Sequence, residues 1–145
     1  MDLSEVDAVR KIIEAHNAEI SRCYAQGLFD SVAAVFTADA WQMPPNSPPL
    51  IGREAIRAFW AQATQWGGWQ FSLSVQQVDV CGSIAVERGK YNLRFTAGPT
   101  APPHMNSFED WGNYLVYWRR EEDGQWRIAA DAPVSERPGP AAMAT

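Results

Sequence analysis

The sequence predicts an α+β domain in which three N-terminal helices pack on one face of an antiparallel sheet. Up to about residue 65, apolar residues recur every three or four positions, the spacing of amphipathic helices. After Gly67-Gly68 the period changes to two, which is the alternation of β-strands. The chain has 145 residues, 46% of them hydrophobic, the usual size of one domain with a single core. We expect one domain over residues 1–137 and a flexible tail over residues 138–145.

The first helix is expected from Ser4, a residue type suited to the N-cap, to about residue 26, and Gly27 should end it. Its apolar stripe lacks one member, and His16 occupies that position, so the imidazole should face the same side as the stripe. A short second helix is expected over residues 31–36 and a third over residues 53–65.

Four strands should follow, separated by two glycine-containing turns and a long proline-rich loop. They are expected over residues 69–79, 84–95, 111–120 and 125–132. In the third of them Asn113, Leu115 and Tyr117 alternate with Tyr114, Val116 and Trp118, so both faces are largely apolar. Because a sheet buried on both faces needs a second cover, we expect a homodimer through the sheet.

Glu87 is the first candidate for chemistry. One face of the second strand reads Ala85, Glu87, Gly89, Tyr91, Leu93, Phe95. The Glu87 carboxylate is the one charged group on this more apolar face, and desolvation would raise its pKa toward the range that a general acid or base needs. The alternative is structural, with Glu87 paired to an arginine or placed at a solvated strand end.

His16 and Asp131 are the other two candidates. A histidine titrates near physiological pH, and His16 lies on the stripe that should face the cavity; alternatively it is a core histidine bonded to a backbone carbonyl. Asp131 stands between Ala130 and Ala132 on the last strand, where only small neighbours would shield it. An ordinary salt bridge to a nearby arginine is its alternative.

Three segments carry a resemblance to a known family. They are Phe36-Thr37-Ala38-Asp39-Ala40-Trp41 leading to Gly52–Phe59, then Tyr114–Arg120, and then Gly124–Ile128. In this order they resemble the nuclear transport factor 2-like superfamily, and within it the SnoaL-like and ketosteroid isomerase-like proteins, many of them grouped as domain-of-unknown-function family 4440. The resemblance implies a cystatin-like α+β cone, with a strongly curved sheet and an internal pocket. One such scaffold hosts enzymes, binding proteins and association domains.

The family's isomerase residues are absent from this chain. Aligned on Gly27 and Asp39-Ala40, the family's helix-one tyrosine falls on Ile20 and its carboxylate base on Pro44, and no acid stands over residues 113–116. The sequence therefore disfavours steroid isomerisation of the ketosteroid isomerase type. Cyclases of the SnoaL type need one placed carboxylate or histidine in an apolar pocket, and Glu87, His16 or Asp131 would meet that need.

The aromatic content favours a small hydrophobic or aromatic ligand. The expected ligand-binding residues are Ile20, Trp41, Met43, Trp60, Tyr91 and Asn113. We expect no cofactor and no metal, since His104 with Glu109 and Asp110 matches no standard ligand spacing. A net charge of −5 without a basic run argues against nucleic acid, and the absence of a long apolar run or signal peptide argues for a cytoplasmic protein without membrane contact.

Three functions therefore remain open. The first is cofactor-independent acid/base chemistry of the isomerase, cyclase or dehydratase type in the pocket. The second is ligand binding without catalysis, and the third is a dimeric association module whose sheet interface is the function.

Overall fold

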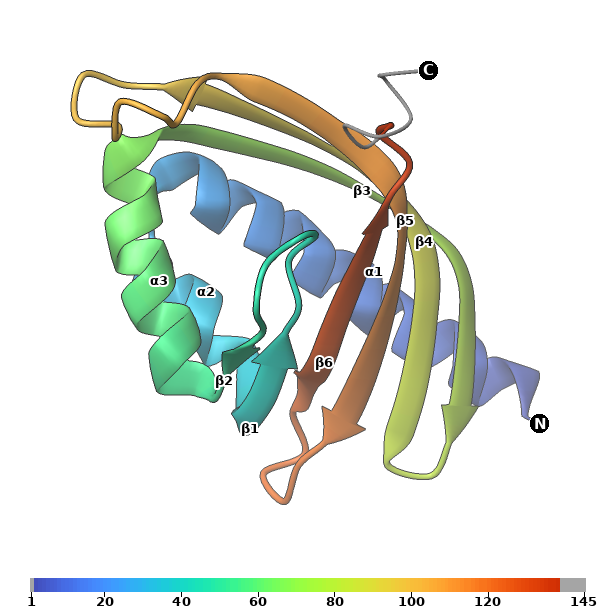
Figure 1. Ribbon diagram of the computed structural model, residues 1–145. Helices are drawn as coiled ribbons and strands as arrows, with labels where there is room; N and C mark the ends of the chain where they lie inside the picture. Colours follow the sequence, from blue (N-terminus) through green and yellow to red (C-terminus); the bar gives the residue numbers. More distant parts are fainter. Residues whose placement is uncertain (1, 139–145) are drawn as a thin grey trace.

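The computed structural model describes residues 2–138 as three helices and one sheet (Figure 1). The elements are α1 (Leu3–Gln26), α2 (Phe29–Ala34), β1 (Phe36–Gln42), β2 (Leu50–Ile51), α3 (Arg53–Trp66), β3 (Gly67–Cys81), β4 (Ile84–Ala97), β5 (Phe108–Arg120) and β6 (Trp126–Ser135). Most of the expected tail, residues 139–145, lies outside the described residues. None of the helices within residues 2–138 is long and apolar enough to cross a membrane.

The six strands form one sheet in the order β2-β1-β6-β5-β4-β3. Figure 1 shows the long strands bending around α1, with α2 and α3 at one end of the concave side. The α+β prediction, with helices on one face of a curved sheet, is confirmed. The sheet is nevertheless mixed, because β1 pairs with β6 in parallel while the other neighbours are antiparallel. The sequence pattern had joined Phe36 to the second helix, whereas it begins β1.

Both ends of α1 are fixed by local hydrogen bonds. The N-cap is Asp2 and not Ser4: the Asp2 carboxylate accepts the Ser4 backbone N–H at 3.0 Å. At the other end Gly27 has a φ of 70°, the left-handed conformation in which glycine closes a helix without steric cost. The buried stripe of α1 is Val9, Ile13, Asn17, Ile20, Cys23 and Tyr24.

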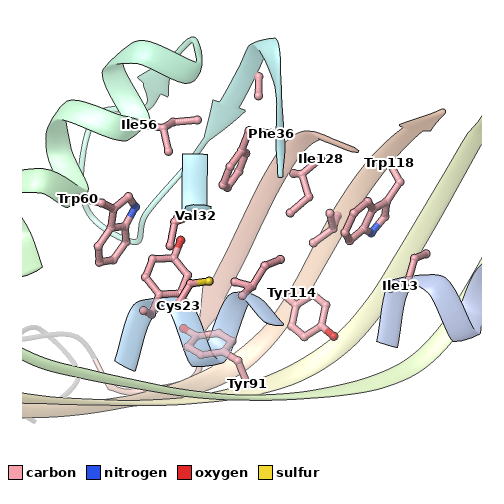
Figure 2. Close-up of a cluster of buried hydrophobic side chains, with 14 of the residues drawn as sticks. Ile13, Cys23, Val32, Phe36, Ile56, Trp60, Tyr91, Tyr114, Trp118 and Ile128 are labelled. Atoms are coloured by element: carbon pink, nitrogen blue, oxygen red, sulfur yellow. The ribbon is translucent and has the colours of Figure 1, made fainter. Parts of the chain in front are cut away.

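The inner face of β4 matches the predicted alternation. Glu87, Gly89 and Tyr91 are buried while the residues between them are exposed. A side chain cannot be accommodated at Gly89, because a Cβ there would lie 2.3 Å from the Tyr114 ring and hydroxyl. Figure 2 shows Tyr114 and Trp118 of the sheet in the core, together with Ile13 of α1. Gly89 therefore lets the Tyr114 ring lie across β4 and reach the neighbouring carboxylate.

Candidate functional site

A cavity of about 400 Å³ lies between the concave face of the sheet and the helices, a size suited to a small molecule. Its wall is mostly apolar and includes the aromatic side chains Phe59, Trp60, Trp69, Phe71 and Phe108. The exposed lining residues, which mark the mouth, are Asn46, Ser47, Arg137 and Pro138. The cavity thus offers an apolar interior with a polar rim.

One row of side chains across the sheet brings two carboxylates to its inner face. The row is Glu87 on β4, Val116 on β5, Asp131 on β6 and Gln42 on β1. Because one strand separates their strands, the Cα atoms of Glu87 and Asp131 lie about 10 Å apart. Asp131 lines the cavity, whereas Glu87 does not. Of the two, Asp131 is therefore the carboxylate that a ligand can contact.

The Asp131 carboxyl has an unusual protonation equilibrium. Burial raises the pKa of Asp131 from 3.8 to about 6, and the nearby negative charge of Glu87 acts in the same direction. A long hydrogen bond from Gln42 Nε2 to Asp131 Oδ2, at 3.5 Å, opposes the rise. A carboxyl with this pKa exchanges a proton near neutral pH, as a general acid or base must.

A polar network holds Gln42 and Tyr24 beside Asp131. The indole Nε1 of Trp60 donates to Gln42 Oε1 at 2.9 Å, which fixes the orientation of the amide. The amide Nε2 then donates to the Tyr24 hydroxyl oxygen at 3.2 Å. Burial, with the charge of Asp131, raises the pKa of Tyr24 above its usual range, so the phenol stays protonated. Since Tyr24 lines the cavity and its oxygen accepts from Gln42, its O–H can donate toward a ligand.

Glu87 is fully buried and held by three donors. Its carboxylate accepts from Asn17 Nδ2 at 2.7 Å, the Tyr114 hydroxyl at 2.5 Å and Trp118 Nε1 at 2.9 Å. Three donors suit an acceptor-only carboxylate and offset much of its desolvation. The arginine partner considered from sequence is not used; neutral side chains satisfy this group instead. Glu87 therefore acts on Asp131 through its charge and makes no contact with the cavity.

Most of the chain matches one protein family. A family model described as "SnoaL-like domain" matches residues 3–130. The chain belongs to the SnoaL-like domain family. This confirms the resemblance that the sequence motifs indicated.

Solved structures similar to this SnoaL-like domain share its fold at low sequence identity. A ketosteroid isomerase-like protein from Erwinia carotovora is 18% identical, with a TM-score of 0.72 over 88% of this chain and 96% of that chain. A candidate scytalone dehydratase from Novosphingobium aromaticivorans is 17% identical, with a TM-score of 0.77 over 91% and 87%. A conserved protein from Planctomyces limnophilus is 19% identical, with a TM-score of 0.78 over 89% and 97%. The search of curated proteins found no match to the sequence.

His16 lies outside the cavity wall of this SnoaL-like domain. Its ring is half-buried and stacks on Trp118, with 5.5 Å between the ring centroids. Burial, with the charge of Arg127, lowers the pKa of His16, which favours the neutral imidazole at neutral pH. The next residue, Asn17, takes the buried position of the stripe and binds Glu87. A ligand in the cavity would therefore contact Asn17 and not His16.

The expected ligand-binding residues divide into two sets. Ile20, Trp60 and Tyr91 line the cavity, and Trp41, Met43 and Asn113 do not. Trp41 is 44% exposed, because strand alternation on β1 turns Gln42 inward instead. Asn113 is exposed on the other face of β5, where it donates to Glu136 at 2.7 Å.

Two polar members of the SnoaL-like site, Gln42 and Tyr24, were not identified from the sequence. Tyr24 lies one helical turn after Ile20, and Gln42 ends the strand that contains the Asp39-Ala40 motif. These two positions in the sequence could have identified both residues as site candidates. Within residues 2–138, no group of three or more His, Cys, Asp or Glu side chains is placed to hold a metal ion.

Proposed function

We propose that this SnoaL-like domain binds a small hydrophobic or aromatic molecule and performs cofactor-independent acid/base chemistry on it, with Asp131 as the acid/base group. One observation carries the proposal: a carboxyl with a pKa of about 6 faces an apolar cavity of about 400 Å³. Isomerisation, cyclisation and dehydration all require a proton to leave or reach a carbon or oxygen atom of the substrate. The resemblance in fold to a ketosteroid isomerase-like protein and a candidate scytalone dehydratase supports this class of reaction.

In this proposal Asp131, Tyr24 and Gln42 each have a role. Ionised Asp131 takes a proton from a carbon next to a substrate carbonyl, and the Tyr24 O–H donates to the carbonyl oxygen as it gains negative charge. Gln42 holds both groups, since its Nε2 lies within 3.5 Å of each of their oxygens. Protonated Asp131 then returns the proton to another atom of the substrate, which completes an isomerisation or releases water in a dehydration.

A proton-exchange experiment tests the proposal with 2-tetralone, a bicyclic ketone with exchangeable protons next to its carbonyl. Exchange into D₂O is followed by NMR with and without protein. We expect the protein to accelerate exchange, with a rate that rises as the pH passes about 6 because the ionised form of Asp131 is the base. Asp131→Asn should abolish the acceleration, whereas Glu109→Gln, an exposed carboxyl change on β5, should retain it.

The binding-only alternative gives a different result. If 2-tetralone binds in the cavity but its exchange rate stays at the value of the buffer at every pH, Asp131 does not act as a base on this class of molecule. The cavity would then serve ligand binding without catalysis.

A homodimer through the sheet is also proposed, on the basis of the outer face. Several apolar side chains on that face are exposed: Val86 is 36% exposed, Trp111 40%, Leu115 51% and Val134 62%. Neighbouring exposed apolar residues over three strands are typical of an interface. Sedimentation velocity should show a dimer that Leu115→Glu converts to a monomer. A monomer across a wide concentration range in the unmodified protein would refute both the dimer and the association-module reading.

A further inference from the structure

A second polar cluster lies on the cavity wall, away from Asp131. It consists of Tyr91 on β4, Asp110 on β5 and Ser135 on β6, all of which line the cavity. Tyr91 and Ser135 both lie opposite Gly112 in the sheet. No side chain fits at Gly112, because a Cβ there would lie 2.1 Å from a backbone oxygen of β6. The two hydroxyl side chains are therefore free to converge on Asp110, two residues away on β5.

Every hydroxyl proton in this cluster is directed at Asp110. The Tyr91 hydroxyl donates to Asp110 Oδ2 at 2.7 Å, and the Ser135 hydroxyl donates to Asp110 Oδ1. Burial, followed by the hydrogen bond to Asp110, raises the pKa of Tyr91 above its usual range, so the phenol keeps its proton. The Ser135 oxygen also accepts the Arg137 backbone N–H at 3.1 Å. The cluster therefore has no spare donor; its remaining capacity is that of an acceptor.

The carboxylate is not neutralised by a neighbouring side chain. Among residues 2–138, no ion pair includes Asp110. Among the described residues of the cavity wall, Arg137 carries the one cationic side chain, and its Nη1 donates to the Glu109 carbonyl oxygen at 3.3 Å. Each Asp110 oxygen accepts one hydrogen bond and has room for another. A partly buried carboxylate that has no ion-pair partner and has free acceptor positions is stabilised most by a ligand group that donates a hydrogen bond.

We propose that the Tyr91-Asp110-Ser135 cluster binds a hydrogen-bond donor, a hydroxyl or amino group, of the same ligand whose reacting atom lies at Asp131. Ser135 lies four positions after Asp131 along β6, so the two polar ends of the cavity are about 13 Å apart. The wall between them includes Tyr114 and Pro133. The ligand is then an elongated, largely apolar ring compound with a donor at the end away from its reacting atom. This inference rests on the proposed function, because it assigns the second end of the same site.

A pair of probes of nearly equal shape tests the donor preference. 2-Naphthol carries one hydroxyl donor, and 2-methylnaphthalene carries a methyl group in its place. Dissociation constants of both are measured by isothermal titration calorimetry with the full chain. The readout is the dissociation constant of 2-methylnaphthalene divided by that of 2-naphthol, so a larger ratio means a stronger preference for the hydroxyl donor. The apolar contribution to binding largely cancels when this ratio is compared between variants.

Asp110→Asn should lower this ratio at least about tenfold, which corresponds to about 1.4 kcal/mol, since the charged acceptor is lost. Glu109→Gln on the other face of β5 is the matched control and should leave the ratio unchanged. Ser135→Ala removes a hydroxyl that occupies Asp110 Oδ1, so it should keep or raise the ratio. This second variant provides a test even if Asp110→Asn does not fold.

The remaining outcomes separate this inference from the proposed function. An unchanged ratio in Asp110→Asn, or a reduced ratio in Ser135→Ala, would overturn the donor site. A ratio that falls in Asp131→Asn and not in Asp110→Asn would place the donor at Asp131, which would overturn this inference and leave the proposed function standing. If neither probe binds the unmodified protein, the donor site is overturned, and the 2-tetralone exchange experiment decides the proposed function separately.

Discussion

Asp131→Asn should change how the stability of the protein depends on pH. Well below pH 3.8 the carboxyl is protonated in the folded and the unfolded chain and has no effect on this dependence. As the pH rises from about 4 to about 6 the unfolded chain ionises while the folded carboxyl, with its pKa of about 6, still holds its proton. The unfolded state then binds fewer protons than the folded state, so the free energy of unfolding falls as the pH rises. The loss levels off as the pH rises well above 6, where the folded carboxyl is ionised as well.

The size of the effect follows from the two pKa values. A rise from 3.8 to about 6 corresponds to about 3 kcal/mol, an upper value because the side chain has some access to solvent in the cavity. Urea unfolding of the native chain and of Asp131→Asn between pH 4 and pH 8 measures it. The stability of the variant relative to the native chain should increase by up to about 3 kcal/mol over this range.

Other carboxyl groups titrate in the same range, but their contribution cancels in the difference between the two chains. Asp7→Asn, the same chemical change at an exposed position on α1, serves as the control and should run parallel to the native chain. Parallel curves for Asp131→Asn and the native chain would refute the reasoning. They would mean that the carboxyl is solvated in the folded protein and is not prepared for acid/base chemistry.

Two further substitutions test the support of the site. Gly89→Ala should lower the free energy of unfolding in urea by about 3 to 5 kcal/mol, because the added Cβ displaces Tyr114 and removes a hydrogen-bond donor from the buried Glu87 carboxylate. Gly68→Ala is the control, since nothing lies within 4 Å of its Cβ. If both substitutions lowered the free energy of unfolding equally, the packing argument would be contradicted. Glu87→Gln should move the pH midpoint of 2-tetralone exchange below that of the native chain, since a negative charge that raises the pKa of Asp131 is removed. An unmoved midpoint would exclude the electrostatic role.

The main elements of the fold could be predicted because each long element has a clear period. The expected strand at residue 84 begins at the residue where β4 begins, and Gly27 ends α1 as expected. β1 was not recognised, because its burial does not alternate regularly and its pairing with β6 shifts between Phe36 and Trp41. It also follows α2 with only one residue between them, so no turn residue marks the change.

The candidate site could be predicted only in part. Alternation placed Glu87 on the buried face, but its donors come from positions 17, 114 and 118, which only the folded chain brings together. A spacing of three or four residues after Ile13 allows either His16 or Asn17 to be the next buried residue of α1, and in the folded protein Asn17 is the buried one. Asp131 was a candidate because of its small neighbours; its partner Gln42 is 89 residues away in sequence.

The position of β6 between β1 and β5 has a consequence for how the protein is made. Strand β6 comes last in sequence among the six described strands, yet it lies in the middle of the sheet, so a nascent chain that ends before Trp126 presents two unpaired strand edges, one on β1 and one on β5. Both Asp131 and the Ser135 end of the cavity arrive with that strand. Ligand binding should thus begin only after β6 has been synthesised, and a chain interrupted before β6 is prone to aggregation rather than partly active.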